Sequence, residues 1–114
     1  MDLEARAREF MAELGAGRVE AVAAFLADRA VYDVPGLGAM DRDAFVAYLR
    51  AVRLRLPQAA FTVHSVAVKR NVTFVEWSRA PDGAQGIHVL SWDQDGRIAH
   101  ATVHAREPTG QPGT

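Results

Sequence analysis

The chain has 114 residues, of which 24% are charged, and its formal net charge at pH 7 is −1. This length is enough for one hydrophobic core and predicts a single domain. A nearly neutral chain lacks the basic excess with which proteins usually hold a polyanion, so we expect no nucleic-acid partner. Cysteine is absent, which excludes disulfides, thiol nucleophiles and zinc sites built on thiolates.

The amino-terminal segment is charged and contains no apolar run of signal-peptide length. Nowhere does the chain have the roughly 18 consecutive apolar residues that indicate a membrane helix. We therefore expect a cytoplasmic protein that has no membrane partner.

The first third of the chain has the apolar spacing of helices. Residues 3–14 predict a first helix, which Gly15 and Gly17 end because glycine adopts positive φ at little cost. The apolar pattern resumes at Val19 and predicts a second helix that ends near Asp28. The two helices should form a corner.

A strand and a third helix are expected next. Residues 30–34 are largely β-branched and aromatic and predict a short strand, which the Pro-Gly-Leu-Gly segment over 35–38 breaks into a loop. Asp41 is placed to cap a third helix, and Asp43 in its first turn suits the helix dipole. Pro57 marks the exit from this helix.

From Phe61 onward the apolar period changes from that of a helix to that of a strand. Four runs predict strands over residues 61–68, 72–79, 87–92 and 97–105. The turns between them are short and predict an antiparallel meander. Three helices followed by a long sheet make an α+β fold, in which the helices cover one sheet face and leave a cavity. Nothing apolar follows residue 108, so we expect a flexible tail over 108–114.

Residues 1–107 resemble the nuclear transport factor 2 superfamily, which includes ketosteroid isomerases and SnoaL-type polyketide cyclases. The order of the expected elements matches, as do the phrases from Phe25 to Gly36, from Asp41 to Phe45 and from Asp95 to Ile98. The resemblance implies a cone-shaped, curved antiparallel sheet wrapped around three helices and enclosing a pocket. It also implies a homodimer that forms through the convex face of the sheet.

The catalytic positions of ketosteroid isomerase are mostly lost in this chain. That enzyme uses an Asp base with a Tyr and a protonated Asp as donors. The resemblance places these three groups at Val34, Phe10 and His88, of which only His88 can take a polar role. Steroid isomerisation is therefore not expected, although SnoaL-like relatives often keep the pocket and change its polar residues.

His88 is the first candidate catalytic residue. Period two places it on one strand face with Gly86, Leu90 and Trp92, and the resemblance makes that face concave. An imidazole among apolar residues can donate a proton to a bound carbonyl or hydroxyl, or abstract one. The alternative is a hydrogen-bonded core histidine without a catalytic role.

Asp33 and Glu76 are further catalytic candidates because each carboxylate interrupts an otherwise apolar strand. Two arrangements of Glu76 remain open. If its strand face is concave, Glu76 can form an acid–base pair with His88; if the Trp77 face is concave, Trp77 is a pocket wall and Glu76 lies on the convex side. Asp33 has an alternative role as a turn-initiating residue before Pro35.

Apolar and aromatic side chains from several elements should converge on the pocket. We expect the walls and the substrate contacts to come from Phe10, Met11, Leu26, Tyr32, Tyr48, Trp77, Leu90 and Trp92. No metal is expected, since His100 and His104 are about 13 Å apart on one strand and cannot share an ion. No cofactor is expected either, because the chain has no phosphate-binding loop.

Two functions fit these observations. In the first, the chain isomerises, cyclises or hydrolyses a small apolar molecule by general acid–base chemistry without a cofactor. In the second, it is a non-catalytic ligand-binding or dimerising interaction module. The fold does not choose between them; our interpretation is a SnoaL-like protein that binds a small molecule.

The later strands are apolar on both faces, but three short helices can cover only one of them. The uncovered face should therefore pair with a second copy about a two-fold axis. His100, Thr102 and His104 share one face of the last strand and would lie near this contact, so acid should weaken the dimer.

Overall fold

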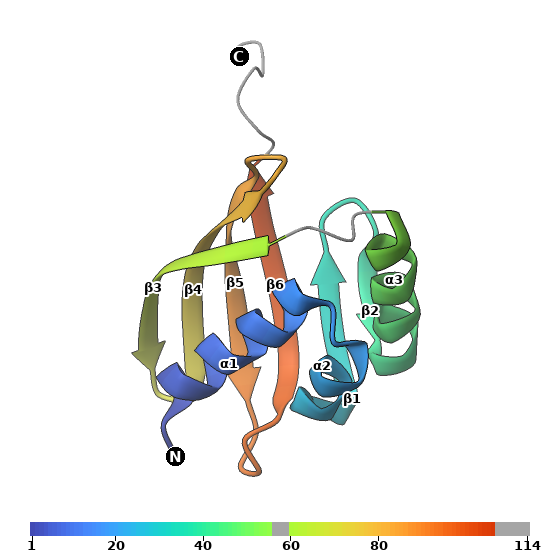
Figure 1. The fold of residues 1–114 in the computed structure, drawn as a ribbon. Coiled ribbons are helices and arrows are strands. Elements are labelled where there is room, and N and C mark those ends of the chain that lie inside the picture. The colour runs from blue at the N-terminus through green and yellow to red at the C-terminus, as the bar shows by residue number, and fades with distance from the viewer. Residues whose placement is uncertain (56–59, 107–114) are drawn as a thin grey trace.

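The structure is a computed structural model that describes residues 1–55 and 60–106 (Figure 1). The tail expected over residues 108–114 lies outside the described residues. Within those ranges the chain forms three helices, α1 (Leu3–Ala16), α2 (Val19–Phe25) and α3 (Arg42–Arg55). It also forms six strands there: β1 (Leu26–Val34), β2 (Gly38–Asp41), β3 (Ala60–Lys69), β4 (Val72–Ala80), β5 (Gln85–Trp92) and β6 (Ile98–Arg106).

Helix α1 begins and ends where the sequence indicates. The Asp2 side chain accepts a hydrogen bond from the Ala5 backbone nitrogen at 3.0 Å and so caps the first turn. Gly17 adopts a left-handed conformation, with φ of 73°, and its N–H bonds to carbonyls of the last turn. The buried face of the helix carries Phe10 and Met11, which pack into the core under the sheet.

The second helix is shorter than the sequence predicts. It ends at Phe25 rather than near Asp28, and strand β1 begins at once at Leu26. Leu26 pairs with Ile98 of β6, and both side chains are buried. Sheet pairing and burial therefore override the helical spacing of this segment.

Strand β2 was not predicted, because the sequence indicated only a loop over residues 35–38 followed by a helix cap at Asp41. Gly36 and Gly38 have φ of 80° and 81° and turn the chain sharply. The chain then runs back along β1, with Val34 opposite Gly38 and Val31 opposite Asp41. Asp41 ends this short strand and caps α3, since its Oδ1 accepts from the Ala44 backbone nitrogen at 2.8 Å. The prediction of this cap is confirmed.

The sheet has the order β2-β1-β6-β5-β4-β3. Strands β3 to β6 form the expected antiparallel meander, whereas β1 lies parallel to β6, so the whole sheet is mixed. Figure 1 shows α1 lying across the concave face of the meander and α3 lying beside β1 and β2. The fold is therefore α+β, as predicted, with the helices on one face of a curved sheet. No helix within residues 1–55 and 60–106 is long and apolar enough to cross a membrane.

Alternation along the strands defines the two sheet faces. In β4, Val75 and Trp77 are buried while Phe74 and Glu76 are exposed. In β5, His88 is buried and Ile87 is exposed. The inner, concave face therefore carries Trp77 and His88.

Gly86 is the residue of β5 that faces Trp77 across the ladder. A Cβ at this position would lie 2.5 Å from Trp77 Cζ2 and 2.7 Å from the His104 carbonyl oxygen. Both distances are far below van der Waals contact, and one neighbour is backbone. Only glycine leaves room here for the indole ring.

Replacing Gly86 with alanine should therefore lower the free energy of unfolding by about 1–3 kcal/mol, the usual cost of overpacking a core. Urea denaturation measures the change. Gln85→Ala is the control, because Gln85 is the exposed neighbour on the same strand. Equal stability of the two variants would show that the indole does not need this space.

The outer face of the sheet exposes apolar side chains. Val31, Phe74 and Ile87 are 39%, 40% and 42% exposed, and they come from three different strands. Each alternates along its strand with buried residues of the inner face, so all three lie on the outer face. This face is where we expect a second copy to bind.

Ile87→Lys should convert a dimer into a monomer, because the charge would be buried in the contact. Light scattering at micromolar concentration gives the mass. Leu37→Lys is the matched control, since Leu37 is 55% exposed but lies in the β1–β2 turn. If the unmodified protein already has the mass of one chain, the dimer is refuted.

Candidate functional site

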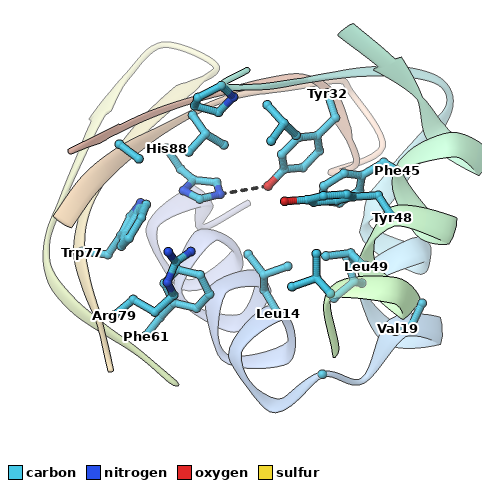
Figure 2. A pocket seen from close by; sticks show the side chains of 17 residues that line it. Leu14, Val19, Tyr32, Phe45, Tyr48, Leu49, Phe61, Trp77, Arg79 and His88 are labelled. Atoms are coloured by element: carbon cyan, nitrogen blue, oxygen red, sulfur yellow. Dashed lines mark hydrogen bonds between the residues drawn. The ribbon is translucent and has the colours of Figure 1, made fainter. Parts of the chain in front are cut away.

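A cavity of about 320 Å³ lies between the inner sheet face and the helices (Figure 2). Its described walls are mainly aliphatic and aromatic. They come from Leu14, Gly17, Val19, Val22, Tyr32, Val34, Pro35, Phe45, Tyr48, Leu49, Val52, Phe61, Trp77, Arg79, His88, Val103 and Ala105.

A buried histidine–tyrosine pair forms the polar part of this cavity. The Nε2 atom of His88 lies 2.9 Å from the Tyr32 hydroxyl oxygen, as the dashed line in Figure 2 marks. The two residues stand on β5 and β1, with β6 between them. Tyr32 reaches across β6 over Ala101, its small, fully buried partner in the ladder.

Helix α3 supports the tyrosine from the other side. The rings of Tyr32 and Phe45 are stacked, with centroids 3.6 Å apart and planes 9° apart. Stacking and burial hold the phenol in one orientation. The hydrogen bond to His88 is therefore made by a side chain that helix and sheet position together.

Both members of the pair are uncharged at neutral pH. Burial lowers the pKa of His88 to about 3, and the nearby positive charge of Arg79 contributes to this shift. Burial also raises the pKa of Tyr32 well above its ordinary value, with a smaller contribution from Tyr48. His88 is consequently a weak base and acts as a neutral hydrogen-bonding group.

Two buried ring nitrogens in the cavity wall have no hydrogen-bond partner within the described residues: Trp77 Nε1 and His88 Nδ1. The other tryptophan differs, because Trp92 Nε1 donates to Thr73 Oγ1 at 3.0 Å. Unpaired buried polar atoms are uncommon in native proteins. Their presence here indicates a place where a ligand or water can bind.

Arg79 is the one permanently charged side chain among the described lining residues. Its guanidinium donates to both carboxylate oxygens of Asp82, with the shortest contact at 2.7 Å. This hydrogen bond lowers the pKa of the Asp82 carboxyl. The guanidinium also lies 5.8 Å from the centre of the Trp77 ring, which places its charge at one side of the cavity.

The structure brings only some of the predicted substrate-contact residues to the cavity. Tyr32, Tyr48 and Trp77 line it together with His88. The others are buried in the core and do not line it: Phe10, Met11, Leu26, Leu90 and Trp92. These side chains belong to the hydrophobic core cluster.

Asp33 and Glu76 are not brought together with His88. Asp33 Oδ2 lies 3.1 Å from His100 Nε2 in a pair that is largely exposed, and Glu76 accepts a hydrogen bond from Ser65 Oγ at 3.0 Å. Both are on the outer face. Of the two arrangements considered for Glu76, the structure has the one in which Trp77 is the wall and Glu76 lies on the convex side.

Arg79 and Phe45 are lining residues to which the sequence analysis gave no role in the site. Arg79 lies two residues beyond Trp77 on the same strand, so period two would have placed it on the same face once that face was known. Phe45 belongs to the apolar face of the third helix, but only the fold shows that it stacks on Tyr32. Within residues 1–55 and 60–106, no group of three or more His, Asp and Glu side chains could hold a metal ion.

The model of the SnoaL-like domain family matches residues 7–112, nearly the whole chain. The chain belongs to the SnoaL-like domain family. The resemblance to the nuclear transport factor 2 superfamily is thereby confirmed. No curated protein matches the sequence.

Several solved structures share this fold. IdmH from Streptomyces antibioticus, a candidate polyketide cyclase, is 14% identical, with a TM-score of 0.83 and 100% of each chain covered. A SnoaL-like protein of unknown function from Burkholderia thailandensis is 18% identical, with a TM-score of 0.82, covering 88% of this chain and 91% of that one. A candidate isomerase of the SnoaL-like family from Agrobacterium tumefaciens is 22% identical, with a TM-score of 0.75 and coverage of 90% and 95%. At these identities the likeness concerns the fold alone.

The low pKa of His88 has a consequence for stability. Between pH 6.5, the ordinary value, and about 3, the folded value, the unfolded chain binds a proton at this residue that the folded chain does not. Above pH 6.5 this residue does not make the free energy of unfolding depend on pH. As the pH falls from 6.5 to about 3, the free energy of unfolding decreases by about 1.4 kcal/mol per pH unit.

Urea denaturation at several pH values should show a shallower acid dependence in His88→Asn than in the unmodified protein. His64→Gln is the control, because His64 is exposed and its Nε2 atom lies 2.9 Å from Ser78 Oγ, away from the cavity. Identical pH profiles for His88→Asn and the unmodified protein would mean that folding does not lower the pKa of His88.

Proposed function

We propose that this SnoaL-like protein binds a small, largely apolar molecule in the cavity and contacts its polar group through His88. The observation that carries the proposal is a neutral histidine, buried against a tyrosine, in the wall of an otherwise apolar cavity. Burying a polar group in such a place costs free energy unless the group is hydrogen-bonded. Its second ring nitrogen, which has no partner in the described protein, supports binding.

The size and walls of the cavity support a ligand of modest size. Its volume of about 320 Å³ is at the lower end of the range of about 300–1,000 Å³ that is typical of small-molecule sites. Aromatic rings from Tyr48, Phe61 and Trp77 form part of the walls. Such walls favour a compact ring system over a long flexible chain.

The catalytic form of the proposal is an isomerisation, cyclisation or hydrolysis without a cofactor. A neutral imidazole can polarise a carbonyl by donating a hydrogen bond, and it need not become charged to do so. The names of IdmH and the Agrobacterium protein support a cyclase- or isomerase-type reaction. However, no carboxylate is among the described lining residues, so the proton acceptor would have to be water or a group of the substrate.

The alternative is a binding module without catalysis, and one observation favours it. The pKa of His88, lowered by burial to about 3, makes this residue a poor general base at neutral pH. In both forms we place the protein in the cytoplasm as a homodimer that pairs through Val31, Phe74 and Ile87 of the outer face. The cavity then lies on the side of the sheet away from the second copy.

Filling the cavity tests the proposal. Val103 lines it from β6, whereas its neighbour Thr102 belongs to the opposite face. Val103→Phe should weaken binding of the apolar fluorophore 1-anilinonaphthalene-8-sulfonate by about tenfold or more, which corresponds to about 1.4 kcal/mol. Fluorescence titration measures the dissociation constant.

Thr102→Phe adds a ring to the outer face and should leave that dissociation constant unchanged. Equal affinity of the Val103→Phe variant and the unmodified protein would place the fluorophore elsewhere and remove the support for a binding cavity. Circular dichroism of both variants checks that the fold is intact.

A further inference from the structure

The two ring nitrogens that have no partner among residues 1–55 and 60–106 belong to neighbouring strands of the cavity wall. Trp77 is on β4 and His88 on β5, and the two rings are 5.6 Å apart between centroids, with an angle of 62°. Figure 2 shows the indole nitrogen of Trp77 at the edge of its ring nearest to His88. Two donors that share one oxygen can be no more than about 5.8 Å apart, twice a normal N···O distance. The ring placement is compatible with such sharing.

Gly86 keeps the indole in this place. The ring atoms Cζ2 and Cε2 of Trp77, which lie beside its nitrogen-bearing edge, would be 2.5 Å and 3.0 Å from a Cβ on Gly86. The glycine therefore allows the indole to lie close over β5, two residues from His88. Phe61 packs edge-on against the same indole, with ring centroids 4.9 Å apart, and further restricts its position.

The tyrosine fixes which nitrogen of His88 carries the proton. Tyr32 is buried and keeps its proton, so its hydroxyl needs an acceptor. Among the described residues, the atom placed to accept this hydrogen bond is Nε2 of His88, which lies 2.9 Å from the hydroxyl oxygen. An imidazole nitrogen that accepts carries no hydrogen, and in the neutral ring the proton must then be on Nδ1. Both unpartnered nitrogens, Trp77 Nε1 and His88 Nδ1, are therefore N–H donors.

We propose that Trp77 and His88 form a two-donor site that binds an acceptor oxygen of the ligand, namely a ketone-type carbonyl or the enolate derived from it. The inference rests on the proposed function and adds the chemical class of the ligand. Two uncharged donors match a neutral or partly negative oxygen and reject a group that can only donate. The positive charge of Arg79 acts at His88 and favours negative charge on that oxygen.

Three ligands that share one frame test whether the site selects a carbonyl oxygen. 1-Indanone, indane and 1-indanamine have the same bicyclic frame and carry a carbonyl, no polar group and an ammonium group respectively. We expect 1-indanone to displace the fluorophore at about three- to tenfold lower concentration than indane, which corresponds to one or two hydrogen bonds. 1-Indanamine should bind more weakly than indane.

Two tryptophan-to-phenylalanine variants test whether the indole N–H of Trp77 is one of the two donors. Trp77→Phe keeps an aromatic ring but removes the N–H, so it should abolish the advantage of 1-indanone over indane, measured as the ratio of the two affinities within this variant. Trp92→Phe is the control, because the Trp92 N–H already has Thr73 as its partner and Trp92 does not line the cavity. This variant should keep the advantage of the ketone.

The protonation of His88 is tested without any ligand. Nitrogen-15 NMR distinguishes the two neutral forms of imidazole, and we expect Nδ1 to carry the proton in the unmodified protein. Tyr32→Phe removes the hydroxyl that selects this form and should shift the population toward Nε2–H. A proton on Nε2 in the unmodified protein would overturn the inference whatever the ligand experiments give.

The outcomes separate this inference from the proposed function. If indane and 1-indanone both displace the fluorophore equally, the cavity binds ligands but the two-donor site is wrong. If the fluorophore binds and neither compound displaces it, the carbonyl class is likewise wrong. If Val103→Phe leaves the dissociation constant of the fluorophore unchanged, the proposed function fails and this inference fails with it.

Discussion

The parallel pairing of β1 with β6 is the constraint on which the site depends. The meander of β3 to β6 can form from local turns, but by itself it carries only one half of the polar pair, His88 on β5. The other half, Tyr32, lies 56 residues away and reaches the cavity because β1 adds to the free edge of β6. A parallel pair needs a long connection, and here that connection contains β2, α3 and three strands of the meander. Tertiary pairing, not local sequence, therefore assembles the site.

Burial then determines the chemistry that this site can support. Desolvation removes charge from His88 and keeps the proton on Tyr32, while the exposed carboxylates of Asp33 and Glu76 stay on the other side of the sheet. The cavity thus contains directional but uncharged hydrogen-bonding groups, with one guanidinium at its side that is held by Asp82. Such a site suits the recognition or polarisation of a neutral polar group better than the abstraction of a proton from carbon.

Periodicity was sufficient to predict much of the fold. The four later strands agree with the sequence ranges to within a few residues, and the Asp41 cap is present, because alternation and capping are local signals. The end of α2 and the existence of β2 could not be predicted, since both depend on pairing with distant strands. The same reason explains the site: the face of Glu76 follows from the register that sets Val75 opposite His88, and period two alone leaves that register undetermined.

The cavity has two walls of different origin, which meet at the stacked rings of Tyr32 and Phe45. The sheet wall carries Trp77 and His88, whereas the opposite wall is largely α3, with Tyr48, Leu49 and Val52. Helix α3 packs mainly on β1, β2 and α2, and therefore touches the polar wall chiefly through the Tyr32–Phe45 stack. Substitutions on its inner face can change the width and shape of the cavity without disturbing the ladder that sets the polar groups. Under the proposed function, ligand size and ligand chemistry are therefore set largely by separate elements, so that changes in one helix would be enough to alter the size of the ligand.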